Sequence, residues 1–381
     1  MTGKPLMIAL AAAAGVFLWQ TLTIRYNYRG NWTALFFTGD RQPVPPELAS
    51  STYRVPHSIG YDGQYYRLIA HDPLLKNAYD RYLDNARLRY RRILVPALAW
   101  ALAGGKPRWI DGTYLFVVLA SLFLGVFWSV HYLQLDELPA PLGLMLLLDP
   151  ATLTSIDRML LDGVVTTLVV GFILGERRGN NVLRYVTSML APLVKETGLV
   201  LVCAAVLADL WRRQYRRATI SATAALPGMA WFAYVEARTS SPEPTGLLTI
   251  PTLGIIRRIF TFRELPDAAL QAAFRAVDLL SILGFAATLW LAWRWIRKDG
   301  ITATTLLMSM FLVMALVVGE RDHMNDAYGY ARPVSPLLFY VMLRALAVRD
   351  WRYLAPPLLV TLSVLIYFAK PLLGILHGIA T

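Results

Sequence analysis

The residues best suited to chemistry lie in one short run, residues 60–73, where an aspartate stands among glycines and aromatic rings. Asp62 lies between a tyrosine and a glycine, and Tyr65 and Tyr66 follow closely. A carboxylate near a membrane surface is partly desolvated, which raises its pKa and suits it to take a proton from a hydroxyl group. Aspartate is also a favoured helix N-cap, and a helix is expected to begin near Gln64. Asp62 is therefore either a candidate general base or the N-cap of this helix.

A run of cations, residues 87–92 (RLRYRR), stands between this loop and the next apolar segment. Its last two members, Arg91 and Arg92, open that segment. Guanidinium forks match phosphate geometry, so both arginines are candidate ligands for a lipid phosphate. Attraction of ordinary anionic headgroups is the alternative.

Two adjacent charges, Lys195 and Glu196, fall in a tight turn between two apolar segments. Charged side chains are costly at such a place unless they pair or serve a ligand. An ion pair with each other is the simplest interpretation, and contact with a charged substrate is the functional one.

Three aspartates, Asp149, Asp157 and Asp162, lie in or beside a second connection, and one of them could supply another acidic position near a substrate. Helix capping or pairing with Arg158 explains any single one equally well. The five histidines show no spacing typical of zinc ligands, so no metal site is expected. A divalent cation held by carboxylates is the one cofactor that the sequence leaves open.

The composition is that of a membrane protein. Of 381 residues, 56% are hydrophobic and only 16% are charged, far from the balance of a soluble domain. The formal charge of +12 does not indicate a nucleic-acid partner, because the basic residues are spread beside apolar segments and form no single basic domain. Membrane topology accounts for most of this charge.

A helix needs roughly 20 residues to cross about 30 Å of hydrocarbon. Apolar segments predict about eleven such helices, near 6–24, 92–104, 112–133, 158–175, 181–193, 197–211, 218–236, 272–296, 301–319, 331–348 and 353–374. The intervening stretch 138–148 is bracketed by prolines and is interpreted as a re-entrant or interfacial segment.

The distribution of arginine and lysine predicts the orientation. Alternate short connections are rich in basic residues, beginning with Lys106 and Arg108, and are assigned to the cytoplasm. The connections 25–91, 134–157, 237–271 and 320–330 are then extracytoplasmic. No internal repeat is found, so we expect one transmembrane domain over 1–381 with a structured extracytoplasmic loop at 25–91.

Four segments together resemble the GT-C superfamily of membrane glycosyltransferases, which use polyprenyl-phosphate sugars. The first is 61–70 (YDGQYYRLIA), similar to the family's first outer-loop signature, and the second is 190–199 (LAPLVKETGL), similar to a turn between two middle helices. The others are 158–162 (RMLLD) and 328–333 (YGYARP), the latter similar to the start of a late helix. Val194 stands where threonine is common, and Ala331 separates Tyr330 from Arg332.

The resemblance implies an inverting transferase in the bacterial inner (plasma) membrane that moves a monosaccharide from a polyprenyl-phosphate carrier to a glycan or lipid acceptor. Asp62 would be the general base on the extracytoplasmic face. The residues expected at the donor phosphate and substrates are Arg91, Arg92, Lys195, Glu196, Arg332, Tyr65, Tyr66 and Asp162. A transporter or flippase of lipid-linked saccharides and a non-catalytic assembly subunit are the alternatives.

Overall fold

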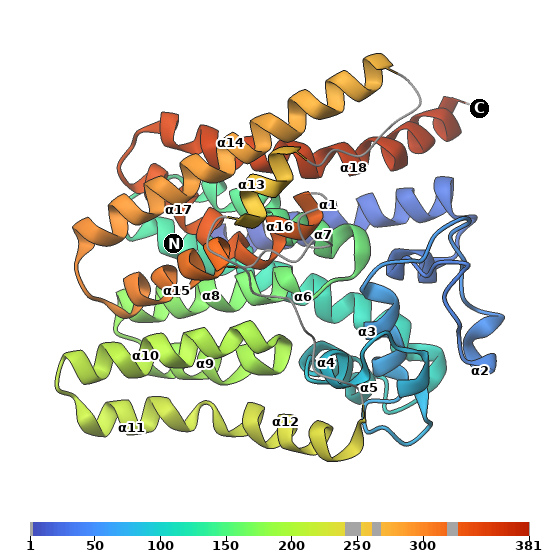
Figure 1. The fold of residues 1–381 in the computed structure, drawn as a ribbon, viewed down its shortest axis with the longest axis horizontal. Helices are drawn as coiled ribbons and strands as arrows, with labels where there is room; N and C mark the ends of the chain where they lie inside the picture. Colours follow the sequence, from blue (N-terminus) through green and yellow to red (C-terminus); the bar gives the residue numbers. More distant parts are fainter. Residues whose placement is uncertain (1–2, 241–252, 261–267, 318–326, 381) are drawn as a thin grey trace.

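The computed structural model describes residues 3–240, 253–260, 268–317 and 327–380 (Figure 1). Within these ranges the regular structure is helical, and the only β-type pairing is a single bridge between Gly39 and Val55. The predicted all-α class is therefore confirmed. The predicted connections 237–271 and 320–330 fall largely outside the described residues.

Short 3-10 helices stand between some of the α-helices along the chain. The α-helices are α1 (Gly3–Asn27), α2 (Pro46–Ala49), α3 (Gly63–His71), α4 (Ala86–Tyr90), α5 (Leu94–Leu102), α6 (Pro107–Gln134), α7 (Pro150–Arg158), α8 (Asp162–Arg178), α9 (Asn181–Val194), α10 (Leu199–Trp211), α11 (Tyr215–Thr223), α12 (Leu226–Arg238), α13 (Leu253–Phe260), α14 (Ala268–Asp299), α15 (Ala303–Val317), α16 (Ala327–Tyr330), α17 (Ser335–Ala347) and α18 (Ala355–Ala380). The 3-10 helices are η1 (Trp32–Phe36), η2 (Tyr79–Tyr82), η3 (Ala140–Leu148), η4 (Glu196–Gly198), η6 (Arg332–Val334) and η7 (Trp351–Leu354).

The long helices run side by side as a bundle, and the short helices α3, α4 and α5 gather at one end of it (Figure 1). We call this the loop end, because residues 28–93 lie there. The other end, where α6 and α8 finish, is called the far end.

Five helical stretches of the described chain are long and apolar enough to cross a membrane: 3–27, 107–134, 215–238, 271–299 and 351–380. In each, only 28% to 50% of the most apolar window is buried inside the protein, which leaves apolar faces for lipid. The chain is an integral membrane protein by this criterion. The prediction of about eleven spanning helices is not supported.

The excess in the predicted count has a physical cause. Helix α8 has 17 residues, at the short end of the range for a span, and every residue from Asp162 to Gly175 is buried. Helix α17 has 13 residues and is buried almost throughout. These segments are apolar because they face other helices, and hydropathy alone cannot distinguish burial in protein from burial in lipid.

The segment predicted to cross at 92–104 does not cross. Helix α5 has nine residues, about 14 Å, and the chain turns back at Gly104 and Gly105, both with positive φ. Asp111, near the start of α6, then pairs with Arg67 of α3 at 2.8 Å, so α6 begins at the loop end. Lys106 and Arg108 therefore lie at the loop end, contrary to the prediction.

The next connection is corrected in the same way. Asp136, just after α6, pairs with Arg177 near the end of α8 at 2.8 Å, which puts residues 134–137 at the far end. From there η3 returns antiparallel to α6, with Gly143 against Val130 and Gly125 against Leu146. Residues 138–158 are thus a broken helix packed against the bundle, and the predicted outer loop 134–157 is not formed.

The sequence also predicts that residues 61–72 form a short helix or helices lying along the membrane surface, with Tyr65, Tyr66, Leu68 and Ile69 as the apolar anchoring face; α3 is the helix of this segment. The helix forms as predicted, but all four side chains are at most 8% exposed. They pack under the loop, against α5, α6 and η1, so the surface-anchoring role is wrong.

The corrected topology can be tested by thiol labelling in sealed vesicles, in a Cys203→Ala background. Arg41, Lys106 and Arg178 are all exposed, the first two at the loop end and the third at the far end. We expect Arg41→Cys and Lys106→Cys to react with an impermeant maleimide from the same side, and Arg178→Cys from the other. Labelling of Lys106→Cys from the side of Arg178→Cys would restore the original topology.

Candidate functional site

Asp62 occupies the N-cap position of α3 but makes no capping hydrogen bond with its side chain. Its carboxylate instead accepts from Arg89 at 3.0 Å and from Arg332 at 3.1 Å. The following glycine makes this placement possible: a Cβ on Gly63 would lie 2.1 Å from the carbonyl oxygen of Arg158. The capping alternative is therefore replaced by a clamp of two arginines.

Arg89 comes from α4, a one-turn helix whose N-cap Asn85 accepts from the Leu88 amide at 2.9 Å. The Arg89 guanidinium also pairs with Asp84 at 2.7 Å and lies 4.8 Å from the centre of the Tyr65 ring. The sequence interpretation did not select Arg89. The helical spacing contained the signal, because residues three apart share a face and Arg89 stands three before Arg92.

Arg91 points elsewhere. It lies 3.4 Å from Glu236 of α12, and Arg87 pairs with the same carboxylate at 3.1 Å. Residues 87 and 91 are four apart and share the other face of this turn. The geometry therefore does not bring Arg91 to Asp62.

Arg92 makes a bidentate pair with Glu196, at 3.0 and 2.6 Å, and donates to the Tyr66 hydroxyl at 2.8 Å. Two loop-end elements far apart in the chain are joined in this way. Lys195 does not pair with Glu196: it lies 2.6 Å from Asp162. The predicted pair between the neighbouring charges is replaced by two pairs to other elements.

Asp162 begins α8 and connects the two halves of the site. One carboxylate oxygen accepts from Lys195, and the other lies 3.5 Å from Nε of Arg332. Arg332 in turn reaches Asp62, and its guanidinium lies 5.4 Å from the centre of the Tyr61 ring. One continuous chain of ion pairs thus runs from the loop at residues 28–93 to the start of α8.

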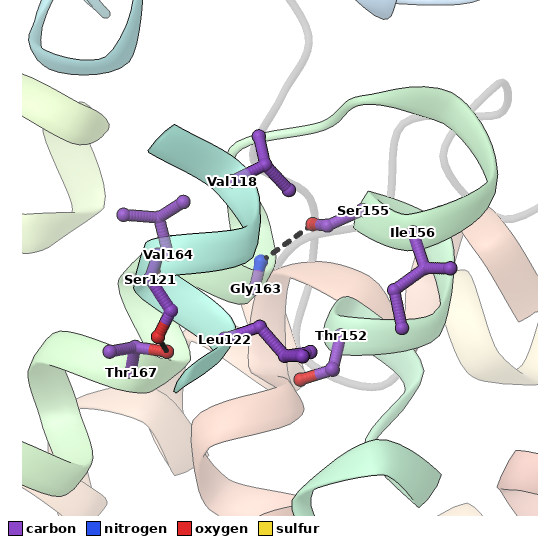
Figure 2. A pocket seen from close by; sticks show the side chains of 9 residues that line it. All are labelled: Val118, Ser121, Leu122, Thr152, Ser155, Ile156, Gly163, Val164 and Thr167. Carbon is purple, nitrogen blue, oxygen red and sulfur yellow. Dashed lines mark hydrogen bonds between the residues drawn. The ribbon is translucent and has the colours of Figure 1, made fainter. Parts of the chain in front are cut away.

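The start of α8 is fixed by packing against α6 and α7, as Figure 2 shows. Ser155 of α7 accepts a hydrogen bond from the Gly163 amide at 2.9 Å, and Thr167 donates to the carbonyl of Ser121 at 3.2 Å. Only about 10 Å³ remains between these side chains, roughly the room for one water molecule. Asp162 is therefore held by a rigid support.

We define the charged cluster as Asp62, Asp162, Glu196, Arg89, Arg92, Lys195 and Arg332. Among them four cations face three carboxylates, and Asp84, whose side chain is 43% exposed, lies at the rim. Arg92, Lys195 and Arg332 are each at most 9% exposed. With Asp84 counted, four cations meet four carboxylates, so an anionic ligand would bind by sharing or replacing one of these carboxylates, and Asp84 at the rim is the most exposed of them.

The electrostatics of Asp62 differ from the sequence-based expectation. Burial alone raises the pKa of its carboxyl, but the charges of Arg89, Arg332 and Arg92 outweigh burial and hold the pKa well below the usual range. Glu196 behaves likewise: burial raises its pKa, but Arg92 and Lys195 lower it to about 2. Without a substrate, Asp62 is an ionised partner of arginines and a weak base.

The remaining candidates have structural roles. Asp149 caps α7 by accepting from the Thr152 amide at 3.2 Å, in the bundle interior and not in an outer loop. Asp157 pairs with the adjacent Arg158 at 2.6 Å. Among the described residues, no group of three or more histidine, cysteine or acidic side chains could hold a metal ion.

No protein-family model, curated protein or solved structure matches this chain. The chemistry available to the cluster follows from its own groups. Cations held close together can bind and stabilise an oxyanion, and a carboxylate beside them can receive a proton.

The pair between Lys195 and Asp162 can be tested by unfolding in mixed micelles. Lys195→Met should lower the free energy of unfolding by about 3 kcal/mol, because it leaves Asp162, 5% exposed, without its closest cation. Adding Asp162→Asn should recover most of that loss. Arg352→Gln, at a pair whose arginine is 88% exposed, is the control, with a change within about 0.5 kcal/mol. An unchanged stability in Lys195→Met would contradict the pair.

Proposed function

We propose that the chain is a GT-C-type glycosyltransferase that moves a monosaccharide from a polyprenyl-phosphate carrier to a glycan or lipid acceptor, on the extracytoplasmic face of the membrane. The observation that supports this most directly is the clamp on Asp62. A carboxylate held between Arg89 and Arg332 combines a proton acceptor with donors suited to phosphate.

In the proposed reaction an acceptor hydroxyl attacks the anomeric carbon of the donor sugar from the face opposite the phosphate. The new carbon–oxygen bond forms as the bond from that carbon to the phosphate oxygen breaks, and the electron pair leaves with the lipid phosphate. The hydroxyl proton passes to Asp62. Arg89 and Arg332 stabilise the charge that grows on the departing oxygen.

The low pKa of Asp62 gives this mechanism a specific form. Arg89 and Arg332 already neutralise the carboxylate, so a donor phosphate that binds them must share or replace that partner. Each guanidinium drawn to the phosphate leaves Asp62 with less compensation, and its pKa rises toward a value useful in catalysis. Asp62 thus becomes a base when the donor is bound.

The neighbouring pairs would position this machinery. Lys195 and Arg332 share Asp162, and Arg92 is occupied by Glu196 and Tyr66. We assign Arg92 and Glu196 to holding the loop against η4. Tyr65 offers a ring beside Arg89, within reach of a sugar at the same place.

A transporter of lipid-linked saccharides is the second candidate. The observation that favours it is the interruption between η3 and α7 at residues 149–150, since broken helices are typical of transport sites. Sugar transfer by purified protein separates the two functions, because a transporter forms no new glycosidic bond.

The role of Asp62 is tested by replacing it with asparagine and measuring transfer from a panel of polyprenyl-phosphate hexoses to membrane acceptors. Turnover should fall by roughly a hundredfold or more, because the amide cannot take the proton. Donor binding should be unchanged or tighter, because the arginines no longer serve a carboxylate. Asp84→Asn is a matched control, since Asp84 shares Arg89 but lies at the rim. Native turnover in Asp62→Asn would remove the base.

The arginine assignment has its own comparison. Arg89→Lys keeps the charge but loses the planar fork, and we expect a loss of roughly a hundredfold in turnover together with weaker donor binding. Arg91→Lys, two residues away and directed at Glu236, should stay within a few-fold of the native enzyme. The reverse order of effects would return the phosphate role to Arg91.

A further inference from the structure

The far end of the bundle contains a second polar site. A cavity of about 350 Å³ opens where the ends of α6, α8, α10, α14, α15 and α17 meet. Cavities of this size accommodate small ligands. Its wall includes Arg177, Arg212 and Arg344, together with the hydroxyl-bearing Tyr340 and Thr304. It lies across the bundle from the charged cluster and shares no residue with it.

Each arginine has a carboxylate partner on another element. Arg177 contacts Asp136 at 2.8 Å, Arg212 contacts Glu176 at 3.0 Å, and Arg344 contacts Asp299 at 2.9 Å; these carboxylates are the acidic side chains of the cavity wall. The three arginine side chains are 26% to 35% exposed. The carboxylates of two pairs, Asp136 and Asp299, are 26% and 27% exposed, so solvent screens these pairs and an anion could share Arg177 and Arg344; Glu176, the partner of Arg212, is 9% exposed.

Arg344 also has hydrogen-bonding capacity beyond its ion pair. Arg344 reaches Asp299 through one terminal nitrogen, and its buried Nε has no hydrogen-bond partner. A guanidinium presents five N–H donors in a planar fork. A phosphate group offers several oxygen acceptors at a spacing that matches this fork. Within the described chain, no second carboxylate of the cavity wall supplies such acceptors to Arg344.

The surroundings favour an anion as well. The connections and helix ends at the far end are rich in basic residues, including Arg213, Arg216, Arg294, Arg297, Lys298 and Arg349. Their summed field raises the local concentration of anions, and basic pockets between helix ends bind phosphate-bearing headgroups.

We propose that this cavity is a binding site for an anionic phosphate group, held by Arg177, Arg212 and Arg344. A phospholipid headgroup and a free phosphate share this chemistry. The site does not depend on the transfer reaction proposed for the loop end.

The test uses the full-length protein in neutral detergent and measures the shift of the unfolding midpoint with added ligand. The probes are dioleoyl phosphatidylglycerol, net-neutral dioleoyl phosphatidylcholine, and inorganic phosphate. We expect phosphatidylglycerol or inorganic phosphate to raise the midpoint in a saturable way, with phosphatidylcholine weaker. Saturation by phosphatidylglycerol alone identifies a lipid headgroup, and saturation by inorganic phosphate identifies the free ion.

A pair of variants at Thr304 makes the test specific. The Thr304 side chain lines the cavity and is partly exposed, so a longer side chain can be accommodated. Thr304→Glu adds a negative charge and should weaken the apparent affinity for the anionic probe at least about tenfold. Thr304→Gln, whose side chain has the shape of glutamate without the charge, should bind the probe as the native protein does. Arg344→Gln should weaken binding similarly, and Arg352→Gln, an exposed arginine at the same end, should not.

The proposal is overturned if neither anionic probe gives a saturable shift, or if Thr304→Glu and Thr304→Gln bind equally well. Loss of the native fold in Arg344→Gln does not affect this comparison, because the Thr304 variants remove no arginine.

Discussion

Charge that is withdrawn from water must be compensated by opposite charge, and the loop end is organised by this constraint. Asp162 and Lys195 are almost fully buried, and each would be costly alone. Their compensation requires side chains from α3, α4, α8, the turn after α9, and η6, all meeting at one place. Because these ion pairs connect different elements, the loop at residues 28–93 cannot move away from the bundle without separating buried charges. The same pairs gather four cations at one place and hold Asp62 ionised.

The sequence predicted the fold class because apolar runs dominate it, but it predicted the topology only in part. Helix α6 was found because it is long and continuous. The interpretation of 92–104 as a span was wrong, since its apolar residues cover a nine-residue helix that packs on α3 and α6. The error then propagated to 134–157, because each crossing sets the side of the next. Buried helices such as α8 raised the predicted number of spans, because their apolar residues face other helices of the bundle and hydropathy does not distinguish these contacts from contacts with lipid.

At the candidate site, the sequence identified most of the charged residues but not which of them pair with each other. Asp62, Lys195 and Arg332 were singled out because charges and aromatic rings beside apolar segments are unusual, and they lie in one network. What the sequence could not supply was the partner of each charge. Neighbours in the chain, Lys195 and Glu196, point to different partners, and Arg89 was passed over in favour of Arg91 because a turn of helix had not been assigned there. The direction of the Asp62 pKa depends on those partners, so it was predicted with the wrong sign.

The clamp on Asp62 also orders events during synthesis. Arg89 leaves the ribosome shortly after Asp62, whereas Arg332 is 270 residues away. At roughly 5 to 20 residues per second, that separation takes the ribosome on the order of 15 to 50 s. Through that interval the early helices can assemble around Asp62, but its second cation, which also contacts Asp162, has not yet been made. The loop end therefore reaches its full charge balance only after the segment that carries Arg332 has been made.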